Sequence, residues 1–136
     1  MQPSAILESA LYVTDLDAAA DFYAEVLGLE RIASVEGRHV FFRCGAGVLL
    51  LFNAEATRNG PPPDARLPVP PHGATGHGHL CFAATADEVE TWKSHLLDRG
   101  IAIEADFEWP NGGRSIYFRD PSDNSIEFAE PRLWGL

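Results

Sequence analysis

Three residues stand out because their side chains could bind a metal ion or move a proton. Glu8, His79 and Glu127 each occur in a short alternating run, ESALY, HLCFA and SIEFA, that is typical of a β-strand. Taken singly, each has an ordinary explanation, because strand glutamates are usually solvated and strand histidines are usually structural. If the three side chains met, one imidazole and two carboxylates would suit one divalent ion, Zn²⁺, Ni²⁺, Mn²⁺ or Fe²⁺, and could transfer protons.

An internal repeat indicates where these residues fall in the fold. Residues 37–52 (GRHVFFRCGAGVLLLF) and 113–128 (GRSIYFRDPSDNSIEF) align without a gap at an offset of 76. The identical pairs are Gly37/Gly113, Arg38/Arg114, Phe42/Phe118, Arg43/Arg119 and Phe52/Phe128. The alignment indicates a duplicated pair of strands with their turn, and it makes Leu51 the counterpart of Glu127.

The segments that precede these repeats also correspond. Residues 8–28 and 79–100 each read as a short strand followed by an amphipathic helix that ends at a glycine. Asp15 or Asp17 is expected to cap the first helix, and a capping box begins at Thr85 in the second. The same succession of elements is therefore expected in both halves.

Each half reads strand, helix, strand, strand, strand, with further strands near residues 29–35 and 101–107. We expect an α+β fold in which two paired βαβββ modules form a curved mixed sheet shaped like a cup. Module one covers about residues 5–54 and module two about residues 77–131 of a single domain over residues 1–136.

A proline-rich linker, about residues 55–76, lies between the modules. Six of the ten prolines of the chain occur in it. Because proline lacks an N–H donor and fixes φ, no regular element is expected there. The linker is either a passive connector or a lid draped over a site.

Alternation predicts the direction in which the three residues point. Glu8 and His79 lie opposite the strongly apolar strand faces that should meet the helices. Leu51 lies in VLLLF, a strand that is apolar on both faces and is therefore expected to be covered on both. By repeat symmetry Glu127 faces the same interior, where an unpaired carboxylate costs several kcal/mol unless it is hydrogen-bonded or bound to a metal.

Composition narrows the classes of partner. The formal net charge of −10 argues against nucleic acid and anionic membranes as partners, which leaves small-molecule substrates open. No apolar run is long enough to span a bilayer, and the N-terminus lacks the pattern of a signal peptide. Cys44 and Cys81 form no disulfide framework or metal motif, so buried free thiols in a cytoplasmic protein are expected.

The chain resembles the vicinal oxygen chelate superfamily, which includes glyoxalase I, extradiol dioxygenases, fosfomycin-resistance transferases, methylmalonyl-CoA epimerases and bleomycin-resistance proteins. The resemblance rests on LYVTDLDAAADFYAEVLGLE, GHGHLCF and YFRDPSDNSIEF, and covers nearly the whole chain. It implies a glyoxalase-like cup, a homodimer, and one divalent metal ion held by Glu8, His79 and Glu127. Leu51 takes the fourth ligand position, where leucine cannot ligate.

The resemblance also implies an activity. It points to a metal-dependent lyase or isomerase of glyoxalase type, acting on a small substrate chelated through vicinal oxygens, with Glu8 or Glu127 as the proton-transfer base. The residues expected to line the substrate site are Tyr12, Leu51, Cys81 and Tyr117. The alternatives are an extradiol-type dioxygenase, although its relatives use two histidines and one glutamate, and a non-catalytic binding or resistance protein.

Overall fold

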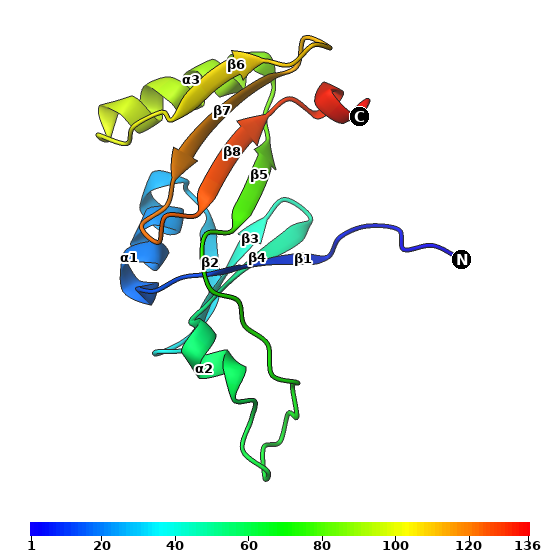
Figure 1. The fold of residues 1–136 in the computed structure, drawn as a ribbon, viewed down its shortest axis with the longest axis vertical. Coiled ribbons are helices and arrows are strands. Elements are labelled where there is room, and N and C mark those ends of the chain that lie inside the picture. The colour runs from blue at the N-terminus through cyan, green and yellow to red at the C-terminus, as the bar shows by residue number, and fades with distance from the viewer. The chain divides into compact units, whose positions relative to one another are not determined.

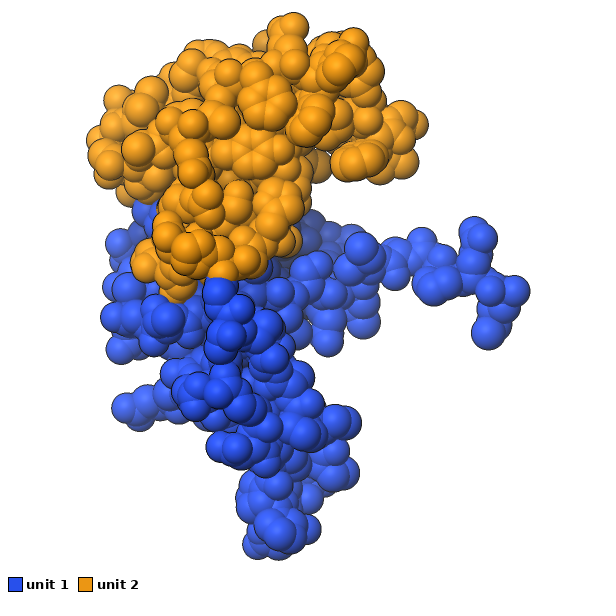
Figure 2. Space-filling model, in the orientation of Figure 1, with its two compact units in different colours: residues 1–76 blue, residues 77–136 orange.

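The computed structural model describes residues 1–136, which form two compact units, residues 1–76 and residues 77–136 (Figure 2). The first unit contains strands β1 (Glu8–Tyr12), β2 (Glu30–Val35), β3 (His39–Cys44) and β4 (Gly47–Phe52), and helices α1 (Leu16–Asp21) and α2 (Ala54–Arg58) (Figure 1). Helix α1 continues directly into a π-helical turn, η1 (Phe22–Val26).

The second unit repeats this succession of elements. It contains β5 (His79–Ala83), α3 (Ala86–Asp98), β6 (Ala105–Glu108), β7 (Arg114–Arg119) and β8 (Ser125–Ala129), followed by a 3₁₀ turn, η2 (Pro131–Trp134) (Figure 1). The strand order is β1-β4-β3-β2 in the first sheet and β5-β8-β7-β6 in the second. In each sheet the first strand runs parallel to the last and the other pairs are antiparallel, so the expected α+β fold is confirmed.

The helices begin where the sequence places their caps. Asp15 caps α1, and its Oδ1 accepts a hydrogen bond from the Ala18 N–H at 3.0 Å. At the start of α3, Glu88 N–H donates to Thr85 Oγ1 at 3.3 Å and Thr85 N–H donates to Glu88 Oε2 at 2.7 Å. The predicted capping box is therefore confirmed, and it satisfies two N–H groups that would otherwise lack partners.

One face of each sheet packs against its helix. In the first unit the buried face carries Leu11, Val40, Phe42, Leu49 and Leu51, and the Tyr23 ring in η1 lies 6.0 Å from that of Phe42. In the second unit the buried face carries Leu80, Phe82, Ile116, Phe118, Ile126 and Phe128. The Trp92 ring of α3 stacks on Phe128 at 4.5 Å. The opposite faces carry the polar candidates.

The register corrects one expected equivalence. Glu8 pairs with Val48, and His79 pairs with Ser125, so Glu8 and His79 hold the same place in their sheets. Leu50 lies two residues after Val48, and Glu127 lies two residues after Ser125, so Leu50 is the counterpart of Glu127. The neighbouring strands agree, because Phe41 pairs with Leu50 and Tyr117 pairs with Glu127.

The prediction that Leu51 is the counterpart of Glu127 is therefore wrong by one residue. Residues 44–47 separate the paired positions in the first hairpin, whereas residues 120–124 separate them in the second, which is one residue longer. Leu51 is fully buried on the face that meets α1. It consequently does not line the face that carries Glu8 and Tyr12, and its predicted role in substrate binding is also wrong.

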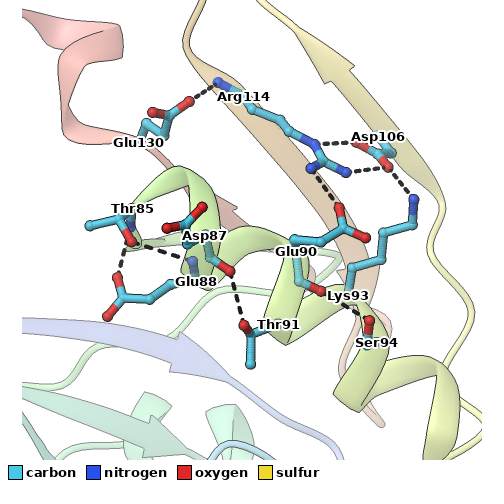
Figure 3. Close-up of polar contacts among 10 residues, drawn as sticks. All are labelled: Thr85, Asp87, Glu88, Glu90, Thr91, Lys93, Ser94, Asp106, Arg114 and Glu130. Atoms are coloured by element: carbon cyan, nitrogen blue, oxygen red, sulfur yellow. Dashed lines mark hydrogen bonds and ion pairs between the residues drawn. The ribbon is translucent and has the colours of Figure 1, made fainter.

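A cluster of ion pairs joins α3 to strands β6 and β7 of the second sheet (Figure 3). The Arg114 guanidinium donates to both carboxylate oxygens of Asp106 at 2.9 Å and to Glu90 Oε2 at 2.7 Å. Lys93 Nζ donates to Asp106 Oδ2 at 2.7 Å. These pairs, above all the one with Arg114, hold the pKa of Asp106 at about 2.

The linker and the cysteines depart from expectation. The linker was expected to hold no regular element, but α2 forms before the first of its prolines, where Asn53 Oδ1 accepts from the Glu55 N–H at 2.9 Å. Both cysteines are free, as expected, but neither is buried: Cys44 is half-buried and Cys81 is exposed. None of the helices combines the length and the apolar character needed to cross a membrane.

Candidate functional site

A histidine and a nearly buried glutamate meet on the open face of the second sheet. Glu127 lies in the central strand β8 and its side chain is 6% exposed. Its Oε2 lies 3.3 Å from His79 Nε2, across the parallel pair β5 and β8. Its Oε1 is buried and accepts no hydrogen bond of good geometry, although the Cys81 thiol and the Tyr117 hydroxyl both interact with this carboxylate. A buried carboxylate oxygen without a well-placed donor is unfavourable, so a cation at this point would stabilise the pair.

The contact of His79 Nδ1 with the backbone orients the ring so that Nε2 faces Glu127. His79 Nδ1 lies 3.1 Å from the Ser125 carbonyl oxygen, which can only accept a hydrogen bond. We therefore assign a proton to Nδ1, which leaves Nε2 directed at Glu127 Oε2. Two acceptors at that distance require a proton or a cation, and histidine ligands of metals are held by such a backbone contact.

Cys81 and Tyr117 flank this pair, as both are opposite Glu127 in the register of their strands. The Tyr117 ring stacks beside His79, with centroids 6.2 Å apart. Burial, followed by the Glu127 carboxylate, raises the pKa of Tyr117 to about 12. Although residue Cys81 as a whole is exposed, shielding of its thiol from water, followed by the Glu127 carboxylate, raises the pKa of Cys81 to about 12. Both groups are therefore protonated at neutral pH and can donate hydrogen bonds.

The other predicted site residues belong to the first unit. Glu8 is exposed at the start of β1, at the position that corresponds to His79. Tyr12 lies on the same face as Glu8, and its hydroxyl is 2.8 Å from His72 Nδ1. Within either unit no group of three or more His, Cys, Asp or Glu side chains is placed to hold a metal ion. The second unit brings together two of the three predicted ligands.

A buried polar network that the sequence reading missed positions His79 and Glu127. Asn124 is 1% exposed; its Oδ1 accepts from the Gly78 N–H at 2.7 Å, and its Nδ2 donates to Asp120 Oδ2 at 2.9 Å. The network thereby joins the residue before His79 to the loop before β8. The DPSDN segment was read only as a family pattern, although it supplies these supporting groups.

Comparisons with known proteins agree with this fold. Residues 5–128 match the family described as the Glyoxalase/Bleomycin resistance protein/Dioxygenase superfamily. The crystal structure of lactoylglutathione lyase from Agrobacterium tumefaciens is 47% identical and has a TM-score of 0.93, with all of both chains covered.

Two further relatives are more distant. A virulence protein of Salmonella typhimurium is 31% identical over 124 residues, which is 88% of this chain and 79% of the relative. A fosfomycin resistance protein of Listeria monocytogenes shares the fold at a TM-score of 0.69 and 19% identity, over 93% of this chain and 91% of the other.

Proposed function

Because the chain belongs to the Glyoxalase/Bleomycin resistance protein/Dioxygenase superfamily, we propose that it is a metal-dependent enzyme of glyoxalase type. The proposed reaction is of the lyase or isomerase class, on a small substrate that presents two vicinal oxygens. The similarity to the Agrobacterium protein, which is named a lactoylglutathione lyase, supports this class. The observation that carries the proposal is the His79–Glu127 pair, in which one buried carboxylate oxygen accepts no hydrogen bond of good geometry.

These residues fit a divalent cation. His79 Nε2 and the Glu127 carboxylate would hold it in the second unit, and Glu8 is the third ligand of the proposal. Nitrogen and carboxylate donors suit Zn²⁺, Ni²⁺, Mn²⁺ or Fe²⁺. When bound, such an ion supplies a Lewis acid that stabilises negative charge on a substrate oxygen.

The side chains around the pair have separate tasks. A carboxylate of Glu127 or Glu8 accepts the proton that the substrate carbon loses. The Tyr117 hydroxyl, which stays protonated, donates a hydrogen bond to the oxygen that becomes negative.

A non-catalytic binding protein is the second candidate. Only two of the predicted metal ligands, His79 and Glu127, meet within one unit. A protein with this fold that binds no metal ion would hold a small molecule without converting it. Such a protein would show no metal-dependent stability and no turnover.

Metal titration separates these functions. Calorimetry on chelator-treated protein should show that Zn²⁺, Ni²⁺, Mn²⁺ or Fe²⁺ binds, and that Glu127→Gln weakens binding by at least about tenfold, since even indirect substitutions at metal sites cost 10–100-fold. Glu108→Gln, an exposed glutamate of the same unit, should bind like wild type. If no ion binds wild type more tightly than Glu127→Gln, the metal hypothesis fails. Turnover of S-lactoylglutathione by the metal-loaded protein then tests the reaction class.

A further inference from the structure

A second candidate binding site lies within the first unit, between its sheet and the proline-rich segment that follows α2. The cavity has a volume of about 550 Å³, within the range of small-molecule sites. Its floor is formed by Phe41 and Phe52 on the open face of the sheet, and its cover includes Leu67, Val69 and His72. All of these residues lie within residues 1–76.

The segment that borders the cavity is tied to α2 and to the sheet by polar contacts. The His72 N–H donates to the carbonyl of Thr57 in α2 at 3.1 Å, and His72 Nδ1 lies 2.8 Å from the hydroxyl of Tyr12 in β1. The His72 ring also meets the Phe52 ring edge-on at 4.6 Å. The proline-rich segment therefore forms one wall of an open cavity on the sheet, and the alternative of a passive connector does not describe it.

The walls of the cavity favour a flat, aromatic ligand. The His39 ring stacks on Phe41 at 4.1 Å with an angle of 9° between the rings, and Phe52 meets Phe41 edge-on at 5.3 Å. Aromatic walls of this kind gain from stacking and edge-on contact with another ring.

The polar groups of the cavity favour an anion. Arg38 and His39 both line it, and no aspartate or glutamate does, although the chain carries 20 acidic residues. Arg38 Nη1 donates to the Ala56 carbonyl at 2.7 Å, which fixes the guanidinium and leaves its other N–H groups for a ligand.

His39 supplies a second donor. Burial, followed by the charge of Arg38, lowers the pKa of His39, so its imidazole is neutral at pH 7. Its Nδ1 is buried without a partner. A proton on Nδ1 would bury a donor with no acceptor, so we assign the proton to Nε2, which then can donate to a ligand oxygen.

We propose that this cavity binds a small aromatic carboxylate, with its ring against Phe41 and Phe52 and its carboxylate near Arg38 and His39. The proposal goes beyond the proposed metal-dependent activity and does not require it, because every residue it uses lies in the first unit. The binding of an aromatic carboxylate is therefore tested on the full chain after a chelator has removed any metal ion. Its outcome does not depend on whether the metal hypothesis is correct.

Three probes of similar shape test the charge preference. Calorimetric titration with 2-naphthoate, neutral 2-naphthalenemethanol and 2-naphthylmethylammonium should show naphthoate binding at least about tenfold more tightly than the cation, as one hydrogen bond to a charged group implies. Arg38→Met should weaken naphthoate by at least about tenfold and leave naphthalenemethanol nearly unchanged. Arg43→Met is the matched control, since Arg43 lies in β3, the strand that follows Arg38, but pairs with Glu30.

A space-filling variant locates the site. Val69 lines the cavity and is 50% exposed, so Val69→Trp should fill the space without unfolding the unit and should abolish naphthoate binding. Val35→Trp, at a residue that is 49% exposed and does not line this cavity, should bind like wild type.

The outcomes that overturn the proposal are definite. They are equal affinity for naphthoate and the ammonium probe, unchanged naphthoate binding in Val69→Trp, or naphthoate-induced amide shifts confined to residues 77–136. If Arg38→Met fails to fold, the selectivity of the wild type and the Val69→Trp result decide the question.

Discussion

The ion-pair cluster beneath the candidate site offers a quantitative test of the second unit. Asp106 accepts hydrogen bonds from Arg114 and Lys93, which lower its pKa from an ordinary 3.8 to about 2. At about 1.4 kcal/mol for each unit of pKa, this corresponds to about 2.5 kcal/mol. The Asp106 side chain is 24% exposed, so solvent screening reduces the expected contribution to about 2 kcal/mol. Asp106→Asn should lower the free energy of unfolding by that amount at pH 7.

The direction of the Asp106 pKa shift determines how the stabilisation depends on pH. The folded-state pKa of Asp106 lies below its ordinary value, so the folded state binds fewer protons than the unfolded state. The stabilisation is complete above about pH 4 and is lost as the pH falls through about 2. The difference between wild type and Asp106→Asn should therefore shrink to below about 1 kcal/mol at pH 2.5.

Urea denaturation followed by tryptophan fluorescence measures this effect in the right part of the chain. The three tryptophans, Trp92, Trp109 and Trp134, all lie in the second unit, so their fluorescence reports its unfolding. Glu108→Gln is the control, because Glu108 is exposed on the same strand. A difference below about 0.5 kcal/mol at pH 7, as for an ordinary surface pair, or an equal difference at both pH values, would refute the reasoning.

Three further outcomes are expected. Asn124→Ala should lower the unfolding free energy of the second unit by about 2–4 kcal/mol in the same fluorescence assay, because the part-buried Gly78 N–H loses its acceptor and Asp120 Oδ2 loses the donor Asn124 Nδ2; a loss below about 1 kcal/mol would contradict this. Leu51→Glu should destabilise the first unit by at least about 4 kcal/mol in thermal melts, and Leu50→Glu by less, since only Leu51 faces α1; the reverse order would contradict the register. We also propose a homodimer, so light scattering at micromolar concentration should give about twice 14.8 kDa, and a monomer would exclude it.

The elements that the sequence predicted correctly are those whose signals are local. Asp15 and the Thr85–Glu88 box lie within four residues of the backbone groups that they cap. The phase of β8 was equally readable, because SIEFA alternates and only one phase buries Ile126 and Phe128.

The register of β4 could not be predicted in the same way. Its sequence GVLLLF is apolar at almost every position, so a shift of one residue exchanges Leu50 for Leu51 without exposing a polar group to the core. The gapless alignment hid the extra residue of the second hairpin loop, where Asp123 adopts a left-handed φ of 66°. Loop length, and not strand composition, decides the equivalence here.

The cavity was unpredictable for a different reason. Its enclosure depends on contacts between residues far apart in the chain, such as Tyr12 with His72, which lie 60 positions apart. Proline-rich sequence excludes helices and strands but does not say where the segment packs. The donors Arg38 and His39 begin a strand and carry no motif that would identify a ligand site.

The corrected register also shows how the two copies of the duplicated unit diverged. At equivalent open-face positions the first unit has Leu50 and Phe41, whereas the second has Glu127 and Tyr117. A glutamate at such a buried position is tolerable only where a cation or donor compensates its charge, and His79 Nε2 lies 3.3 Å from Glu127 Oε2, where a proton or a metal ion between them would do so. The first unit instead has an apolar, aromatic open face. Two sheets of the same topology therefore present different chemical groups, a carboxylate beside an imidazole on the second and aromatic rings on the first.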